Sequence, residues 1–305
     1  MNTPVAYLNG QIVPIDDAKL HVFDLGIVGG TSVTEMVRTF RHVPFRLEQH
    51  LDRLDNSLSV VGFETGLSRA DWLRISQQVV GENSRLISEY EDLGIILFVT
   101  AGVNLTYVGR SAAAKACGPT VCVHTFPLPF ELWADPIVTG VSLVTVQTRS
   151  IPDDVIDARV KHRSRLHWHL ASRQAKSIDP NATAILTDDA GHLTETAAGN
   201  LCLVDGTTIV TPARNVLEGV SREYVAELSR SLGFEFIHAA VSPDDLARAD
   251  EAFLTSTPSC LLPVTRFNGM TIGSGQPGPV FQQLIAEWGK AVGVDLVGQM
   301  QRRKN

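Results

Sequence analysis

The chain has 305 residues, of which 44% are apolar and 19% charged, and its formal net charge is -7. This length allows two domains of ordinary size, and the composition is that of a globular protein rather than a disordered one. A mildly acidic chain without a Lys/Arg-rich run lacks the positive surface that binds nucleic acid or an anionic membrane. The amino terminus lacks the features of a signal peptide and no apolar stretch could span a bilayer, so we expect a cytoplasmic protein.

The first part of the chain predicts a β-hairpin, two helices and a buried strand. An Asn-Gly pair divides residues 5–14 into two short strands, as in a tight hairpin turn. Apolar residues recur every three or four positions over 45–61, which is helical spacing. A second helix is predicted over 68–80, with a serine at the start as its N-cap. The apolar, branched run 94–100 predicts a buried strand.

A proline-rich stretch over residues 125–136 predicts the boundary between two domains, because it cannot sustain a helix or a central strand. We therefore expect an N-terminal α/β domain over 1–126, a linker over 127–136 and a larger C-terminal domain over 137–305. In that second domain we predict strands over 141–146, 184–187, 201–204 and 252–254 and helices over 166–176 and 222–232. This mixed order of elements predicts an α+β fold.

The cysteines and histidines predict neither disulfides nor a metal site. Four cysteines are too few for a disulfide framework in a chain of this length, and none forms a CxxC pair. Buried free thiols are expected at Cys117, Cys122, Cys202 and Cys260. Histidines cluster at positions 162, 167 and 169, but no acid or cysteine stands there at the spacing of zinc ligands.

The most informative chemical feature is Lys161 followed downstream by Glu195. A lysine amine forms Schiff bases with carbonyl compounds, and a carboxylate can hold a pyridine nitrogen protonated. These are the two groups that pyridoxal phosphate chemistry requires. The other residues of the segment 194–200 are small or neutral, which is typical of a pocket wall, although a lysine and a glutamate taken alone are usually solvated surface.

The segment 160–166, Val-Lys-His-Arg-Ser-Arg-Leu, together with the Glu195 segment resembles the core motif of the class IV aminotransferases. This family of fold type IV pyridoxal phosphate enzymes includes branched-chain aminotransferases, D-amino acid transaminases and aminodeoxychorismate lyases. The resemblance implies a two-domain, D-amino acid aminotransferase-like fold with a small α/β N-terminal domain and a larger C-terminal pseudo-barrel domain. It implies that Lys161 carries the cofactor as a Schiff base and moves the substrate α-proton, and that Glu195 binds the pyridine nitrogen.

Three further segments resemble the phosphate-binding motifs of the family. In residues 45–54 the match is Arg46, whose guanidinium can bind two phosphate oxygens, although it could also be a surface arginine paired with Glu48 or Asp52. The other two segments offer a turn into a helix, over 217–222, and a late strand with small hydroxyl residues. Their phosphate candidates are Val220, Ser221, Ser256 and Thr257.

The loop Gly273–Gly278 satisfies the GxGxxG pattern of dinucleotide-binding proteins. It contains Pro277, and no βαβ unit with a placed acid follows it, so a surface loop is predicted instead.

The positions linked to substrate choice differ from those of better-known relatives. D-amino acid transaminases and aminodeoxychorismate lyases place an arginine just before the glycine that follows the buried strand, where this chain has Ala101. Branched-chain aminotransferases carry a tyrosine five residues after the lysine, where this chain has Leu166. Gly29, Thr31 and Thr34 replace aromatic or acidic pocket positions, which predicts a roomier or differently shaped acceptor pocket. The missing arginine and the run that starts at Thr31 favour the branched-chain subgroup over the D-specific one.

We therefore predict a pyridoxal phosphate-dependent transaminase that moves an amino group between a branched-chain-like or other hydrophobic amino acid and a 2-oxo acid. The alternatives are an aminodeoxychorismate lyase-type enzyme, a D-amino acid transaminase and a non-catalytic homologue that binds the cofactor. Retention of Lys161, Glu195 and Arg46 argues against the last, because a scaffold needs none of them. The resemblance also implies a homodimer, and no nucleic acid, membrane or metal ion is expected as a partner.

Overall fold

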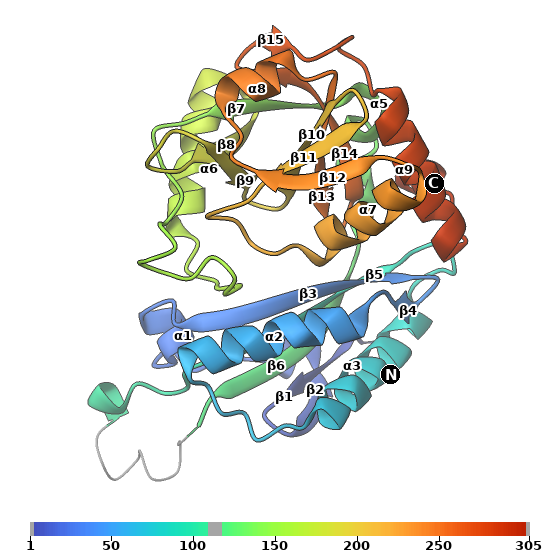
Figure 1. Ribbon diagram of the computed structural model, residues 1–305. Coiled ribbons are helices and arrows are strands. Elements are labelled where there is room, and N and C mark those ends of the chain that lie inside the picture. Colours follow the sequence, from blue (N-terminus) through green and yellow to red (C-terminus); the bar gives the residue numbers. More distant parts are fainter. Residues whose placement is uncertain (1–2, 109–117, 303–305) are drawn as a thin grey trace. The chain divides into compact units, whose positions relative to one another are not determined.

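The structure is a computed structural model that describes residues 3–108 and 118–302. Within these ranges the chain forms two compact units (Figure 1). Unit one comprises the residues up to Leu128 together with Arg159–Ser164, and unit two comprises Pro129–Ala158 and the residues from Arg165 onward. The first change of unit falls inside the predicted linker 127–136. The segment 159–164 lies in unit one although the sequence assigned it to the C-terminal domain 137–305, and the predicted domain limits themselves stay a prediction.

Unit one contains a six-stranded sheet in its described residues, with the strand order β2-β1-β6-β5-β3-β4 (Figure 1). The strands are β1 (Val5–Leu8), β2 (Gln11–Pro14), β3 (Ser32–Phe40), β4 (Val43–Pro44), β5 (Leu93–Thr100) and β6 (Thr120–Pro127). The helices are η1 (Ile15–Asp17), α1 (Leu25–Val28), α2 (Leu47–Val61), α3 (Arg69–Asn83) and η2 (Ser84–Leu86). Adjacent strands of this sheet pair antiparallel.

The local signals in the sequence produced the expected elements of unit one. Strands β1 and β2 form the predicted hairpin, in which Asn9 (φ 47°) and Gly10 (φ 94°) supply the two positive φ angles of a tight turn. Ser68 caps α3 in a reciprocal capping box with Asp71, and the helix continues to Asn83, a few residues beyond the predicted end. The predicted helix over 45–61 and strand over 94–100 are confirmed by α2 and β5.

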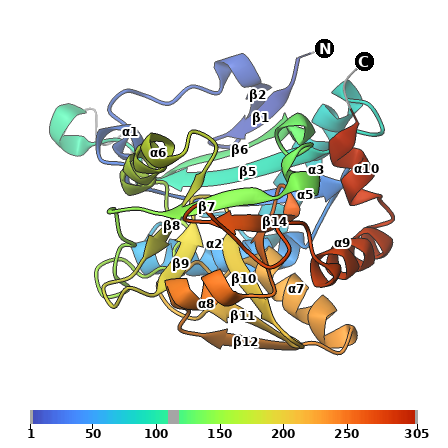
Figure 2. The same ribbon diagram turned by 90° about the horizontal axis from the view of Figure 1, so that it is seen from above.

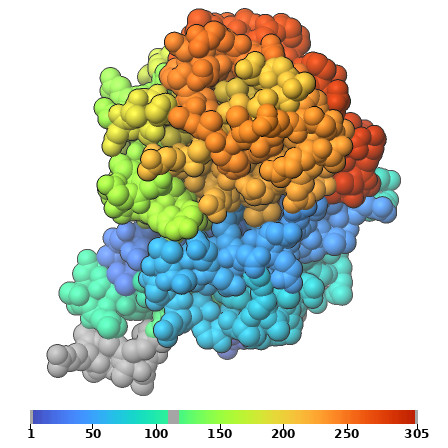
Figure 3. Space-filling view, viewed as in Figure 1, coloured from blue at the N-terminus to red at the C-terminus, as the bar shows by residue number. Residues whose placement is uncertain are grey.

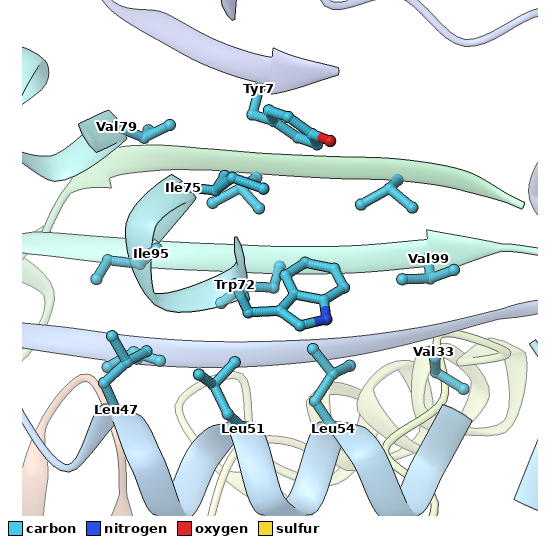
Figure 4. Packing of buried hydrophobic residues seen from close by; sticks show 14 of the residues in the cluster. Tyr7, Val33, Leu47, Leu51, Leu54, Trp72, Ile75, Val79, Ile95 and Val99 are labelled. Carbon is cyan, nitrogen blue, oxygen red and sulfur yellow. The ribbon is translucent and has the colours of Figure 1, made fainter. Parts of the chain in front are cut away.

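Helices α2 and α3 bury their apolar sides against the sheet of unit one. Leu51 and Leu54 of α2 and Val79 of α3 are completely buried, and Figure 4 shows them directed toward the strands. Each such side chain contributes about 1.5–3 kcal/mol through removal of apolar surface from water. The outer faces of both helices form the blue to cyan surface of unit one in Figure 3. The apolar spacing read from the sequence therefore fixes which side of α2 contacts the strands.

Two expectations for unit one need correction. The stretch 125–136 was predicted to exclude a central strand, but β6 runs to Pro127 between β1 and β5 in the middle of the sheet. Pro127 is tolerated because it is the last residue of the strand, opposite Leu93, where a missing N–H costs little. Strand β3 was not predicted. It carries buried polar residues such as Thr34 and Glu35, which interrupt a simple apolar alternation.

Unit two contains the predicted C-terminal strands and helices together with several others (Figure 2). The strands are β7 (Val141–Thr145), β8 (Thr183–Thr187), β9 (Leu193–Thr196), β10 (Asn200–Asp205), β11 (Thr208–Pro212), β12 (Glu235–Ala239), β13 (Glu251–Ser256), β14 (Cys260–Phe267) and β15 (Met270–Thr271). The helices are η3 (Phe130–Leu132), α5 (Pro136–Thr139), α6 (Leu166–Ile178), α7 (Val220–Ser231), α8 (Pro243–Arg248), α9 (Pro279–Val292) and α10 (Leu296–Gln301).

The sheet of unit two closes on itself. Strand β9 pairs with β8 on one side and with β10 on the other, which completes a ring in the order β10-β13-β14-β7-β8-β9. The joint between β9 and β10 is the pair formed by Glu195 and Asn200. Completely buried apolar side chains, among them Leu143, Ile185 and Leu201, belong to the core of this unit. The predicted pseudo-barrel is therefore confirmed, and Glu195 lies where the ring closes.

Cys122, Cys202 and Cys260 are free and buried, as predicted, whereas Cys117 lies outside the described residues. Burial raises the pKa of the Cys122 thiol to about 11 and that of Cys202 to about 12. Within 3–108 and 118–302, no group of three or more His, Cys, Asp or Glu side chains could hold a metal ion. Over the same ranges, no helix has the length and apolar character that crossing a membrane requires.

Candidate active site

The segment that carries Lys161 extends the sheet of unit one. The N–H of Thr34 donates to the carbonyl of Lys161 (2.8 Å), and the N–H of Arg163 donates to the carbonyl of Ser32 (3.0 Å). His162 lies opposite Val33 between these two bonds, so the segment pairs antiparallel with the start of β3. The N–H of Lys161 donates to Ser57 Oγ on α2 (3.2 Å). Hydrogen bonds on both sides therefore fix the backbone of Lys161, whose side chain is half-buried.

A buried cluster of charged residues lies beside this segment in unit one. Glu35, on β3, accepts hydrogen bonds from His50 Nδ1 (3.0 Å) and from Arg53 Nε and Nη2 (2.8 and 2.7 Å), both on α2. Burial would raise the pKa of Glu35, but the charges and hydrogen bonds of Arg53 and His50 hold that pKa well below its usual range. Burial lowers the pKa of His50 against the attraction of Glu35, and the charges of Arg53 and Lys161 add to the lowering. His50 is therefore neutral at neutral pH.

Arg46, the predicted phosphate-binding arginine, is the residue immediately before α2. It adopts a left-handed backbone conformation (φ 52°), and its guanidinium carbon lies 5.8 Å from the centre of the Phe45 ring. Arg46 is about three helical turns from Ser57, the α2 residue that contacts Lys161, whereas Arg53 is about one turn away. Arg53 was inside the motif read from the sequence but was not selected. Helical spacing between Arg53 and Ser57 was the signal that could have found it.

In unit two, the carboxylate of Glu195 is held by two donors. Its Oε2 accepts from Asn200 Nδ2 (3.0 Å) and from the N–H of Leu217 (3.2 Å), and Asn200 Nδ2 also donates to the carbonyl of Leu217 (2.9 Å). Asn200 is buried, while Glu195 is half-buried. The sequence pointed to Asn200 only as a neutral neighbour. The structure makes it the residue that orients Glu195 and attaches it to the turn before α7.

The start of α7 has the properties of an anion-binding helix terminus. Its N-cap is Gly219, no side chain caps it, and Val220 and Ser221 are buried in its first turn. A Cβ on Gly219 would lie 2.1 Å from Asn200 Oδ1, so only glycine fits this close approach. By contrast, the GxGxxG loop leads into α9, whose first amides already donate to the Glu251 carboxylate (2.9 and 3.0 Å). The uncapped amides of α7 therefore suit a phosphate better than those of α9.

The predicted hydroxyl residues follow the end of β13. Ser256 Oγ lies 2.6 Å from Ser259 Oγ, and Thr257 is half-buried in the next position. Thr255, which lies opposite Asn200 across the strand pair, has a buried hydroxyl without a hydrogen-bond partner in the described part of the chain. Asn200 thus connects the end of β13, the Glu195 carboxylate and the start of α7. Unit two brings together the predicted set Glu195, Val220, Ser221, Ser256 and Thr257 around this asparagine.

Comparison with known proteins identifies the family. Residues 32–267 match the family described as amino-transferase class IV. The chain is 31% identical to a putative branched-chain-amino-acid aminotransferase of Methanocaldococcus jannaschii, over 93% of this chain and 97% of that protein. It is 30% identical to D-alanine aminotransferase of Bacillus licheniformis, over 89% and 91% of the two chains. These relationships extend over nearly the whole length of each protein.

The fold gives the same result. A branched-chain amino acid aminotransferase from the organism abbreviated T.th., complexed with N-(5'-phosphopyridoxyl)-L-glutamate, has a TM-score of 0.83 and 25% identity, covering 98% of this chain and 95% of that chain. This chain therefore belongs to the class IV aminotransferases. It is an enzyme of the group that moves an amino group between an amino acid and a 2-oxo acid, so the predicted family, fold and enzyme class are confirmed. The predicted cofactor is confirmed for the family by the phosphopyridoxyl compound in that structure.

Proposed function

We propose that this chain is a pyridoxal 5'-phosphate-dependent transaminase whose amino donors are branched-chain-like or other hydrophobic amino acids and whose acceptors are 2-oxo acids. The observation that carries the proposal is the position of Lys161. Its backbone is held between β3 and Ser57, and its half-buried side chain adjoins the buried Glu35 cluster. A surface lysine needs no such anchoring, whereas an amine that must reach one carbonyl carbon repeatedly does.

The residues of both units fit the parts of the cofactor. Lys161 provides the amine for its aldehyde, and the oriented carboxylate of Glu195 provides the partner for a protonated pyridine nitrogen. The uncapped amides at Val220 and Ser221, the close approach at Gly219 and the hydroxyls of Ser256 and Thr257 suit a phosphate. We propose Arg53 as a second candidate for phosphate binding beside Arg46, because α2 places Arg53 about one turn from the residue that holds Lys161.

Each residue then has a definite task in the reaction. When bound, the cofactor withdraws electron density from the bond to the substrate α-hydrogen. The Lys161 amine accepts the α-proton and returns it as a general base and then a general acid. Glu195 supplies a negative charge that favours the protonated ring, and Asn200 and the Leu217 amide keep its carboxylate in one orientation. Donor and acceptor react in turn at the same residues, which predicts ping-pong kinetics.

The test is covalent attachment of the cofactor to position 161. Purified protein is incubated with pyridoxal 5'-phosphate, reduced with borohydride and digested, and the labelled peptide is located by mass spectrometry. We expect label on Lys161 in the wild type, no label at that position in Lys161→Ala, and release of the cofactor from unreduced protein at low pH. Label on another lysine, or no uptake at all, would contradict the proposal.

A D-amino acid donor is the second candidate, because the chain is also 30% identical to a D-alanine aminotransferase. A panel of L-leucine, L-glutamate, D-alanine and D-glutamate with 2-oxoglutarate or pyruvate separates the two candidates. An aminodeoxychorismate lyase-type reaction is recognised in the same assay, because it releases pyruvate without an added 2-oxo acid.

We also propose that the protein is a cytoplasmic homodimer. The support is the family resemblance together with the mildly acidic charge of the chain. Light scattering during size-exclusion chromatography tests the dimer, and fractionation of the cells that produce the protein tests the compartment.

A further inference from the structure

The side chains of Lys161 and Arg163 share one face of unit one. Successive side chains in an extended segment point to opposite faces, and His162, between them, lies opposite the core residue Val33. Val160 is also part of the core beneath α2 and α3. Lys161 and Arg163 are therefore directed to the other side of the sheet, the side of Thr34 and Phe98.

The guanidinium of Arg163 stacks on an aromatic ring of that face. Its central carbon lies 5.2 Å from the centre of the Phe98 ring, and Phe98 lies opposite Thr34 across the β3–β5 pair. The residue keeps solvent exposure, while partial burial of the guanidinium lowers its pKa. Arginine nevertheless stays charged at neutral pH, and a ring beneath it leaves its N–H donors directed around the rim. Stacking therefore holds a cation at a fixed place two residues from Lys161.

In the part of the chain that the structure describes, Arg163 has no carboxylate partner. Other arginines with buried side chains do have one: Arg38 lies 3.7 Å from Asp92, and Arg53 and Arg222 bind Glu35 and Glu223. The undescribed segment 109–117 contains no Asp or Glu that could supply one. A partly desolvated cation without a counter-ion is unfavourable unless an anion binds there at some stage.

We propose that Arg163 binds a carboxylate of the substrate. The inference rests on the proposed function, because the amino acid donor and the 2-oxo acid acceptor both carry that group. A guanidinium can bind a carboxylate through two parallel hydrogen bonds, which would orient either substrate relative to Lys161. The carboxylate is either the one on the α-carbon or the one on the side chain of a dicarboxylic amino acid, and the experiment separates them.

The experiment measures binding as well as activity in protein loaded with pyridoxal 5'-phosphate. Calorimetry records binding of 4-methylvalerate, glutarate and the uncharged 4-methylpentan-1-ol to the wild type, Arg163→Gln and Arg163→Lys. We expect Arg163→Gln to weaken binding of a carboxylate roughly 10- to 150-fold, without changing the alcohol, and Arg163→Lys to retain part of the affinity. Arg74→Gln removes an equal charge from an exposed position on α3 and should match the wild type.

Kinetics with leucine and glutamate identify which carboxylate is bound. A similar rise in KM for both assigns Arg163 to the α-carboxylate, whereas a rise for glutamate alone assigns it to the side chain. Unchanged carboxylate binding in Arg163→Gln overturns the inference, and so does an equal loss for the alcohol, which would indicate a structural role. If Arg163→Gln fails to fold, Arg163→Lys with the same ligands decides, since full loss of selectivity for acid over alcohol there overturns the inference. A wild type that transfers no amino group refutes the proposed function, yet carboxylate binding still reports on Arg163.

Discussion

Glu35 and Arg53 form a buried pair in which two nitrogens of one guanidinium bind both oxygens of one carboxylate, at 2.8 and 2.7 Å. The pair joins β3 to α2, the two elements that also hold the backbone of Lys161. The charged cluster was not visible in the sequence, because its members come from separate elements. It links the stability of unit one to the position of the reactive lysine.

Replacing Glu35 by Gln should destabilise the protein by about 3–5 kcal/mol, because Arg53 would remain buried without a compensating charge. Denaturant unfolding measures the change. Glu48→Gln, at an exposed position on α2, is the matched control and should cost less than about 1 kcal/mol. The double variant Glu35→Gln/Arg53→Gln should recover part of the loss. A single variant as stable as the wild type would show that the pair contributes little.

His50 and Glu35 together predict the response to acid. Both have lowered pKa values in the folded protein, so the unfolded chain takes up protons more readily than the folded one. Stability should therefore be fully present above about pH 6.5, the ordinary His value, and should fall as the pH is lowered from there, with a further loss below the ordinary Glu value of about 4.3. Unfolding of wild type and His50→Gln from pH 8 to 4 checks this.

His50→Gln should remove the part of the pH dependence between about pH 6.5 and 5 and leave the more acidic part. Mutation of the exposed His192, which lies 3.4 Å from Asp188, is the control and should leave the curve near that of the wild type. A wild type that becomes more stable as the pH falls through 6 would contradict the assignment of a neutral His50.

The sequence predicted the elements with local signals and missed those that depend on distant partners. The Asn9-Gly10 turn and the capping box at Ser68 are determined by residues a few positions apart, and both formed as expected. Attachment of Lys161 to β3 depends on backbone pairing between segments far apart in the chain, which leaves no local pattern. The segment 159–164 was therefore assigned to the second domain.

The same distinction applies to the candidate site. Resemblance to the family identified Lys161 and Glu195 by their motifs, and unit two gathers the phosphate candidates near Glu195. Asn200 could not be selected from the sequence, because its role depends on one amide donating to both Glu195 and Leu217. Arg46 was chosen over Arg53 because the motif offers two arginines and only the path of α2 shows which one lies near Ser57.

Gly219→Ala should destabilise the protein by about 1–3 kcal/mol, because the new Cβ would overlap Asn200 Oδ1 and force the side chain to move. Phosphate affinity should fall as well, since the start of α7 would shift. Gly81→Ala is the control: this exposed helical glycine has open space around it, and alanine should stabilise α3 by about 0.5–1 kcal/mol. Thermal unfolding compares the two, and equal effects in the same direction would refute the steric argument.

Asn200→Ala and Asn200→Asp separate the two roles of this side chain. Alanine removes both hydrogen bonds and should cost about 1–3 kcal/mol with little change between pH 8 and 5, because Glu195 and Leu217 lose the same donor throughout. Aspartate keeps the shape but places a second carboxylate about 3 Å from Glu195, so the two cannot both stay ionised without strong repulsion. Its stability should be lowest at high pH and recover as the pH falls, when one proton can be shared between the two groups. Unfolding and transaminase activity of both variants over this pH range provide the measurement. If Asn200→Asp follows the pH profile of Asn200→Ala, then Asn200 does not act on the Glu195 carboxylate.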